Sequence, residues 1–199
     1  MKLYGIPASR AFRSIWAAEE VGVDYELVPT HFLGDSKKPD YLQINPNGRI
    51  PALVDDDLVL FESMAINLYL AKQYGGKLYP SDAADEARAI QWTLWGMTEI
   101  EDSLIQIFVN KVLLPEDQRD PALVVSAAKK LQRPLAVLDA HLAKRDYLLG
   151  SDFTIADLNL AGTLATANVA DFDLSEFENA SRWLAACTGR PSLARARAK

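Results

Sequence analysis

Cysteine is almost absent from this chain of 199 residues, in which Cys187 is the only one. A single cysteine excludes an internal disulfide framework and a Cys-x-x-Cys redox pair, and it is typical of proteins kept in a reducing compartment. The first residues also lack an apolar signal segment. We therefore expect a cytoplasmic protein in which Cys187 is a small buried apolar residue rather than a reactive thiol.

Basic residues are outnumbered, because 21 Lys and Arg stand against 27 Asp and Glu and give a net charge of −6. Nucleic acids and anionic membranes bind basic surfaces, so neither is an expected partner. No segment approaches the roughly 18 consecutive apolar residues that a membrane-spanning helix requires. The composition therefore predicts a globular protein with a sizeable apolar core and no membrane span.

Histidine is scarce as well, since His31 and His141 are the only two. Neither has a partner at the spacing of a metal site or of a catalytic triad. A glycine-rich phosphate loop is also missing. We therefore expect no bound metal.

What the chain does contain is, first, a mixture of strand and helix patterns over residues 1–77. The short apolar run Leu3–Ile6 predicts a buried strand, and the alternating residues Tyr25–Val28 predict a second one. Between them, Ser9 can cap the start of a helix that ends at Gly22. This order predicts a βαβ unit.

A hairpin and another helix follow. The apolar runs 50–54 and 58–61 flank the acidic turn Asp55–Asp57, as in a β-hairpin. Glu62 and Ser63 then open a helix that closes near Gly75. With an irregular segment between the two parts, the order is βαβ followed by ββα.

From about residue 86 onward, every periodic segment is helical. Apolar residues at spacings of three and four predict long helices over 87–112 and 124–142, and shorter ones over 158–169 and 176–188. Thr154 and Asp157 form a capping box before the third of these helices. Pro80 marks a linker at the change of pattern. The sequence therefore predicts an α/β domain over 1–77, a linker over 78–85 and an all-α domain over 86–199.

Three motifs resemble those of the soluble glutathione transferases. They are Asn45–Leu53, Phe61–Ile66 and the box Thr154–Asp157, and a serine at the first strand–helix junction, Ser9, adds to the resemblance. Each motif is weak alone, but together they are specific, and the resemblance covers essentially the whole chain. It implies a thioredoxin-like N-terminal domain that binds glutathione and a helical C-terminal domain that shapes the pocket of a second substrate. Within the family, the chain is most similar to bacterial, theta-like members that use a serine.

The resemblance implies that glutathione pairs like an added strand beside Ile50. The residue that follows, Pro51, would then have a cis peptide bond, as family members have. An ordinary proline at the start of a strand is the alternative.

The resemblance also assigns the charged ends of glutathione. Ser63 would bind the γ-glutamyl carboxylate at a helix N-terminus, and Glu62 would accept from the α-ammonium group. Arg49 and Lys37 are the expected cations for the glycyl carboxylate. Taken without the resemblance, Ser63 could be a routine helix cap and Glu62 a partner of the helix dipole.

Ser9 is the candidate catalytic residue. Its hydroxyl would donate to the glutathione sulfur and lower the pKa of that thiol, close to the positive end of a helix dipole. Tyr4 is the rival, because some classes of the family use a tyrosine from the first strand. Ser9 occupies the position at which the serine classes have their serine.

These residues favour an enzyme that conjugates glutathione to small hydrophobic electrophiles. The alternative is a non-catalytic module of the same fold that binds partners, and such a module would be free to lose the glutathione site. The resemblance further implies a homodimer, which would also cover apolar residues of the long helix over 87–112.

Overall fold

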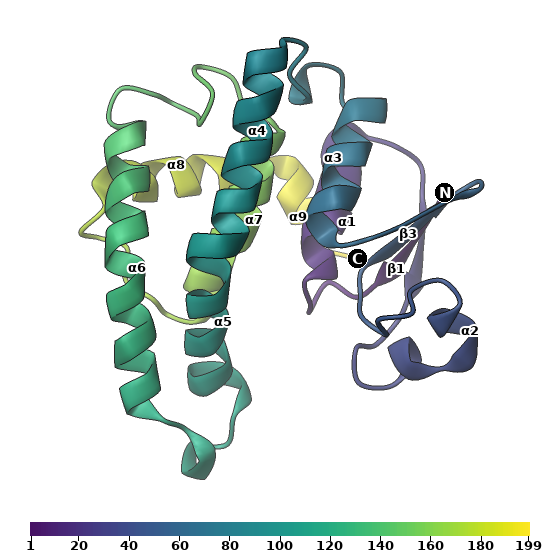
Figure 1. Cartoon of the computed structure of the whole chain (residues 1–199), viewed down its shortest axis with the longest axis horizontal. Coiled ribbons are helices and arrows are strands. Elements are labelled where there is room, and N and C mark those ends of the chain that lie inside the picture. Colours follow the sequence, from purple (N-terminus) through teal and green to yellow (C-terminus); the bar gives the residue numbers. More distant parts are fainter. The chain divides into compact units, whose positions relative to one another are not determined.

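The computed structural model describes residues 1–199, and the chain divides into two units (Figure 1). The first unit contains Met1–Tyr79 together with Gly189–Lys199, and the second contains Pro80–Thr188. No candidate membrane-spanning segment is found among the helices.

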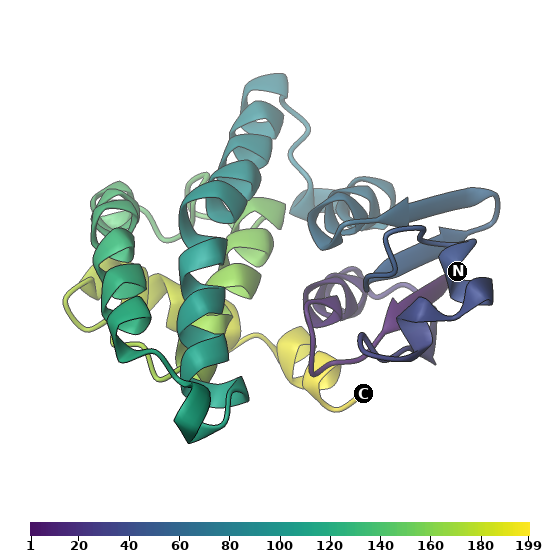
Figure 2. The ribbon, with the colours of Figure 1, turned by 60° about the horizontal axis from the view of Figure 1, so that its bottom comes forward.

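A sheet of four strands forms the centre of the first unit (Figure 2). Its order is β2 (Glu26–Pro29), β1 (Lys2–Gly5), β3 (Ala52–Asp55) and β4 (Leu58–Phe61). β1 is parallel to β2 and antiparallel to β3, which is antiparallel to β4. This is the predicted βαβ-ββα arrangement of a thioredoxin-like domain.

Helices cover both sides of this sheet. α1 (Ala11–Val21) and α3 (Ser63–Tyr74) pack against each other over the face that carries the buried side chain of Leu3. Gly5 lies beneath α1, because a Cβ at Gly5 would come within 2.3 Å of the Cβ of Ala11. The short helix α2 (Pro39–Leu42) lies on the other side, and 3-10 turns cover residues 35–37 and 76–78.

The last helix, α9 (Pro191–Arg197), packs on α1 and therefore belongs to the first unit. The indole Nε1 of Trp16 donates to Ser192 at 3.0 Å, and Arg190 forms an ion pair with Glu20. The sequence had predicted residues 86–199 as one helical domain. Residues 189–199 depart from that prediction because contacts with a distant helix, rather than a local pattern, decide where α9 packs.

The second unit is helical throughout, as predicted. Its elements are α4 (Ala83–Trp95), a π-helical turn (Gly96–Glu101), α5 (Asp102–Phe108), a second π-helical turn (Val109–Leu113), a 3-10 turn (Glu116–Gln118), α6 (Pro121–Leu142), α7 (Ile155–Val169) and α8 (Glu178–Thr188). The predicted helix over 87–112 is therefore interrupted twice. The first interruption begins at Gly96, where a Cβ would come within 2.8 Å of Leu160 on α7.

The capping box before α7 forms as predicted. The carboxylate of Asp157 accepts from the backbone N–H and the hydroxyl of Thr154, at 2.9 and 3.0 Å. It also accepts from the N–H of Leu148 and from the indole of Trp183, both at 2.8 Å. Asp157 is fully buried, so one carboxylate joins the loop before α7 to α8.

Candidate functional site

The register of the sheet brings three chain segments together at one end of the strands, the edge at which β1 and β4 end and β3 begins. Tyr4, near the end of β1, pairs with Ala52 at the start of β3, and Ala52 pairs with Phe61 at the end of β4. The segments that leave β1, enter β3 and leave β4 therefore meet at this edge. They contain most of the predicted site residues: Ser9, Arg49, Ile50, Pro51, Glu62 and Ser63.

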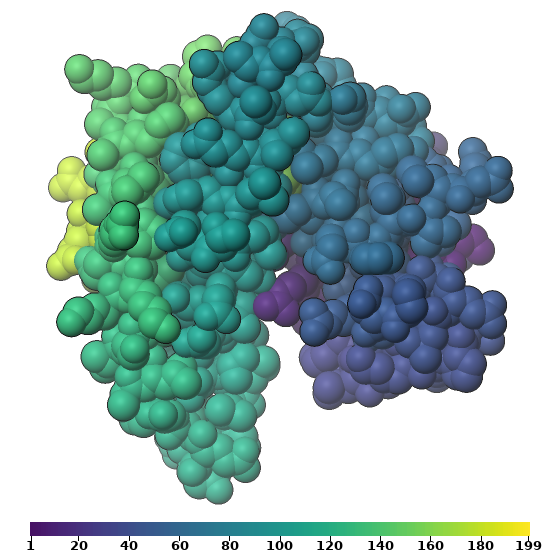
Figure 3. All heavy atoms as spheres, in the orientation of Figure 1, coloured from purple at the N-terminus to yellow at the C-terminus, as the bar shows by residue number.

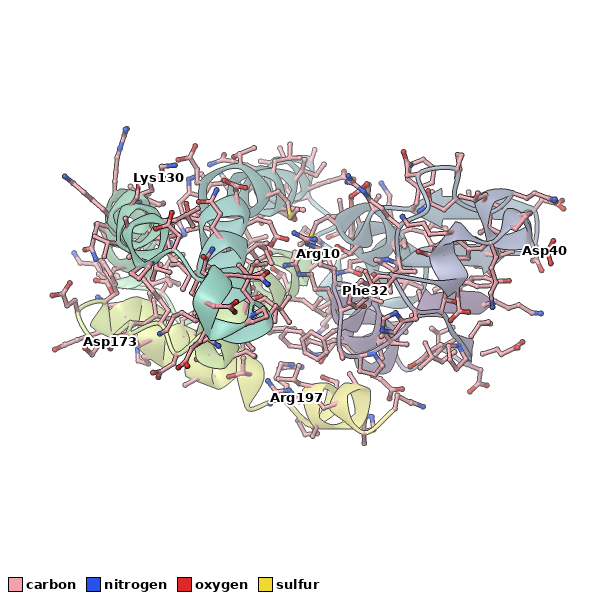
Figure 4. All side chains as sticks on the ribbon, turned by 90° about the horizontal axis from the view of Figure 1, so that it is seen from below. Arg10, Phe32, Asp40, Lys130, Asp173 and Arg197 are labelled. Carbon is pink, nitrogen blue, oxygen red and sulfur yellow. The ribbon has the colours of Figure 1, made fainter.

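Ser9 lies in the turn between β1 and α1, and two backbone groups orient its hydroxyl. Its Oγ accepts from the N–H of Ala11 at 3.1 Å and donates to the carbonyl of Ile6 at 2.7 Å. The helix begins at Ala11 with Arg10 in the N-cap position, so Ser9 caps the helix from one residue earlier than expected. Ser9 is half-buried, and Arg10 projects from the end of the helix (Figure 4).

Tyr4, the rival of Ser9, packs against α2. Its ring and that of Tyr41 meet edge to face, with centroids 5.9 Å apart. Because side chains alternate along a strand, Tyr4 lies on the face of the sheet opposite to Leu3. The Tyr4 hydroxyl forms no hydrogen bond within the chain.

The segment between β2 and β3 forms part of the surface of the first unit (Figure 3). The ammonium group of Lys37 donates to the carbonyl of Gly48 at 2.5 Å. Gly48 has a φ of 60°, a left-handed conformation that favours glycine. Lys37 is thereby held next to the residue that precedes Arg49, so the two predicted cations lie in neighbouring parts of the fold.

The backbone carbonyl of Arg49 accepts two hydrogen bonds. Tyr41 donates its hydroxyl at 2.6 Å, and Asn45 donates its side-chain N–H at 2.7 Å. Both donors are buried. The peptide bond that follows, Ile50–Pro51, is cis, as the resemblance implied. Tyr41 had not been predicted as part of the site, and Asn45 had been noted only as part of a motif.

The junction between β4 and α3 has an unusual backbone. Glu62 has φ 71° and ψ 116°, a conformation that residues other than glycine seldom adopt. Strained backbone of this kind is concentrated at functional sites. Ser63, the first residue of α3, is buried, whereas Glu62 is exposed.

Several polar groups at this edge have no partner within the chain. The guanidinium of Arg49, the carboxylate of Glu62 and the hydroxyl of Ser63 form no hydrogen bond or ion pair there. A set of one cation, one anion and one hydroxyl beside a helix N-terminus suits a ligand that carries carboxylates and an ammonium group.

The remaining candidates from the sequence lie outside this edge. Cys187 is fully buried in α8, as expected of a structural cysteine. His31 belongs to no cluster of potential metal ligands. The ring of His141 contacts the carbonyl oxygen of Leu148 at 2.8 Å and the ring of Trp92. No three His, Cys, Asp or Glu residues gather as a metal site would require.

The sequence matches two family models that together cover most of the chain. The model described as "Glutathione S-transferase, N-terminal domain" matches residues 1–72. The model described as "Glutathione S-transferase, C-terminal domain" matches residues 100–191.

Individual proteins give the same picture. Glutathione S-transferase 3 of Zea mays is 40% identical over 175 residues, which is 81% of this chain and 75% of that protein. Glutathione S-transferase GstB of Escherichia coli K12 is 33% identical over 179 residues, covering 88% of this chain and 86% of that one. The fold matches a theta class glutathione S-transferase of Xanthomonas axonopodis pv. citri with glutathione bound, with a TM-score of 0.92, 32% identity and coverage of 100% and 97%.

Proposed function

The chain belongs to the glutathione S-transferase family, and on that basis we propose that Ser9 is the residue that stabilises the glutathione thiolate. The protein is an enzyme that conjugates glutathione to electrophiles. The observation that supports the role of Ser9 is its hydroxyl, which two backbone groups orient at the edge of the sheet where the unpartnered polar groups gather.

The reaction needs a sulfur anion at neutral pH. The thiol of bound glutathione loses its proton to solvent, and the hydroxyl of Ser9 turns from the carbonyl of Ile6 to donate to the thiolate. Each unit by which this lowers the pKa of the thiol corresponds to about 1.4 kcal/mol in favour of the anion. The sulfur then uses its electron pair to form a bond to the electrophilic carbon, and either a leaving group departs or the electrons move onto the electrophile.

The rest of the edge holds glutathione in place. The N–H and C=O of Ile50, next to the cis Pro51, bind the cysteinyl part. Glu62 accepts from the α-ammonium group, and Ser63 with the first turn of α3 binds the γ-glutamyl carboxylate. Arg49 and Lys37 face the glycyl carboxylate.

Calorimetric titration with glutathione tests this assignment directly. The wild-type protein should bind glutathione, and the variants Arg49→Gln and Ser63→Ala should each weaken binding by about tenfold, the effect of one hydrogen bond to a charged group. Arg88→Gln is the matched control, because Arg88 forms an exposed ion pair with Asp85 in the second unit. Equal affinities of Arg49→Gln and the control would remove Arg49 from the site.

The protein is proposed to act as a homodimer in the cytoplasm. β4 is an edge strand on which Leu58, Val59 and Phe61 are exposed, and α4 exposes Ile90 and Leu94 one turn apart. Exposed apolar residues grouped in this way mark surfaces that a partner covers. A second copy of the chain is the proposed partner, and a small hydrophobic electrophile is the proposed second substrate.

A further inference from the structure

The carbonyl oxygen of Arg49 accepts two hydrogen bonds from side chains. A carbonyl oxygen has two lone pairs, and here Tyr41 and Asn45 occupy one each, at 2.6 and 2.7 Å. Both distances are short for hydrogen bonds to a carbonyl. Both donors are side chains, so the position of this carbonyl is fixed by side chains rather than by backbone hydrogen bonds.

The hold on this oxygen determines the direction of an N–H group. The carbonyl of Arg49 and the N–H of Ile50 belong to the same planar peptide unit. That unit is trans, because the only cis peptide bond of the chain is Ile50–Pro51. In a trans unit the C=O and the N–H point in opposite directions, so fixing the oxygen also fixes the N–H of Ile50.

We propose that Tyr41 and Asn45 are positioning residues, which aim the N–H of Ile50 at the cysteinyl carbonyl of glutathione by holding the carbonyl of Arg49. The inference rests on the proposed function, in which Ile50 binds the cysteinyl part. Neither side chain touches glutathione. They act through one peptide unit, and the N–H is preorganised before the ligand arrives.

The two donors are themselves held from the other side. The ring of Tyr41 packs edge to face on Tyr4 of β1, and this contact fixes the position of Tyr41 relative to the sheet. The side-chain oxygen of Asn45 accepts from the backbone and side-chain N–H groups of Asn47, both at 3.1 Å. These two hydrogen bonds fix the orientation of the Asn45 amide, so that its N–H points toward the carbonyl of Arg49. Burial raises the pKa of Tyr41 to about 12, so its hydroxyl remains a donor at every pH at which the enzyme would be assayed.

The test compares two tyrosine hydroxyls of the same unit. Tyr41→Phe keeps the ring on Tyr4 and removes only the donor to Arg49. The matched control is Tyr69→Phe, because the hydroxyl of Tyr69 donates to Asp55 at 2.7 Å, away from the proposed site. Calorimetry should give a dissociation constant for glutathione about three- to tenfold higher in Tyr41→Phe, and no change beyond about 1.5-fold in Tyr69→Phe. The KM for glutathione should rise by the same factor in Tyr41→Phe, while kcat at saturating glutathione stays within about twofold.

A second ligand separates positioning from general loosening. In a glutathione analogue with a trans-alkene in place of the Cys–Gly peptide bond, the cysteinyl carbonyl is absent and the shape is kept. The wild type and Tyr41→Phe should bind this analogue equally, since the N–H of Ile50 has no acceptor in it. Asn45→Ala, checked for folding by its thermal transition, should show the same ligand dependence as Tyr41→Phe.

The outcomes are distinct. If Tyr41→Phe and Tyr69→Phe bind glutathione alike, the positioning role is wrong and the proposed function stands. If Tyr41→Phe weakens both ligands by the same factor, Tyr41 only maintains the shape of the site, and the inference is wrong again. If the wild-type protein binds no glutathione, the proposed function fails and the inference fails with it.

Discussion

The hydroxyl of Ser9 donates to the carbonyl of Ile6, so its one proton already has an acceptor in the unliganded protein. Stabilising a thiolate at Ser9 therefore requires an exchange of partners, from a neutral carbonyl to an anion. Hydrogen bonds to charged groups are about twice as strong as those between neutral groups, so the exchange is favourable once the thiolate forms.

Ser9→Ala should therefore raise the pKa of enzyme-bound glutathione and lower kcat at neutral pH by roughly ten- to a hundredfold, or about 1.4–2.7 kcal/mol. The dissociation constant of glutathione should change much less, because the other contacts remain. The deficit in rate should shrink as the pH rises, since the free thiol then ionises without help. Thiolate absorbance in the ultraviolet, titrated with bound glutathione, measures the shift.

Tyr4→Phe is the matched control for this experiment. Its titration curve should follow that of the wild type, because the ring packing on Tyr41 is kept. A shifted curve in Tyr4→Phe combined with an unshifted curve in Ser9→Ala would transfer the catalytic role to Tyr4.

The backbone of Glu62 leads to a prediction that sets stability against binding. Its φ of 71° and ψ of 116° cost about 1–3 kcal/mol for a residue with a side chain, and glycine avoids most of that cost. Glu62→Gly should therefore raise Tm by about 2–4 °C, equivalent to about 1 kcal/mol, while it weakens glutathione binding by about tenfold. Glu62→Ala should weaken binding equally without the gain in Tm.

Calorimetry with a glutathione lacking the α-amino group completes this test. Wild type and Glu62→Ala should bind that analogue with similar affinity, because the ammonium partner of Glu62 is gone. If Glu62→Gly binds intact glutathione as tightly as the wild type, the carboxylate has no part in binding.

Cys187 should take no part in the chemistry. It is fully buried in α8, so Cys187→Ala is expected to leave kcat and the KM for glutathione within about twofold of the wild type. Steady-state kinetics with a standard electrophile measures both. A large loss of kcat at unchanged Tm would reveal a cysteine mechanism.

The features that the sequence predicted are those with local signals. Gly22 ends α1 in the left-handed conformation, and Thr154 and Asp157 form their capping box, because each pattern lies within a few residues of chain. The register then brings Ser9 and Ile50 to one edge, although they are far apart in sequence. The family resemblance supplied this grouping, which residue patterns alone would not have given.

The features that were missed depend on contacts between distant segments or on the path of the backbone. α9 packs on α1 through Trp16 and Ser192, which are 176 positions apart. No local sequence pattern predicts a contact over that separation. The hydrogen bond from Tyr41 to the carbonyl of Arg49 forms only because the path of the backbone brings that carbonyl next to the Tyr41 hydroxyl. A tyrosine in a single helical turn gives no sign of that in the sequence.

Val59 gives a test of the proposed dimer. It is 45% exposed on the edge strand β4, and a lysine there would bury a charge in any interface that covers the strand. We expect light scattering at micromolar concentration to give the dimer mass for the wild type and a monomer mass for Val59→Lys. Val137→Lys is the control, because Val137 is 49% exposed on α6, and this variant should remain a dimer. A monomeric wild type, or a dimer that survives Val59→Lys, would contradict the proposal.

The attachment of α9 to α1 predicts how stability depends on pH. Glu20 forms hydrogen bonds with Arg190 and Ser192. Burial alone would raise the pKa of Glu20, but these hydrogen bonds outweigh burial and hold the pKa below its ordinary value of 4.5. A carboxyl group with a lowered pKa stabilises the folded state above its unfolded pKa, and this stability is lost as the pH falls through the folded pKa.

Glu20→Gln should therefore lower the free energy of unfolding by about 1–3 kcal/mol at neutral pH, the range for hydrogen bonds to a charged group. The difference from the wild type should be constant at neutral pH. It should shrink as the pH falls from about 4.5, where Glu20 of the unfolded chain takes up a proton, to the lowered pKa of Glu20 in the folded protein. Urea unfolding at a series of pH values measures it. Glu26→Gln is the control, because Glu26 pairs with Lys2 at 3.6 Å on the exposed surface, and such a pair contributes less than about 1 kcal/mol. A difference between wild type and Glu20→Gln that persists unchanged into acid would mean that packing, rather than the charge of Glu20, holds α9 on α1.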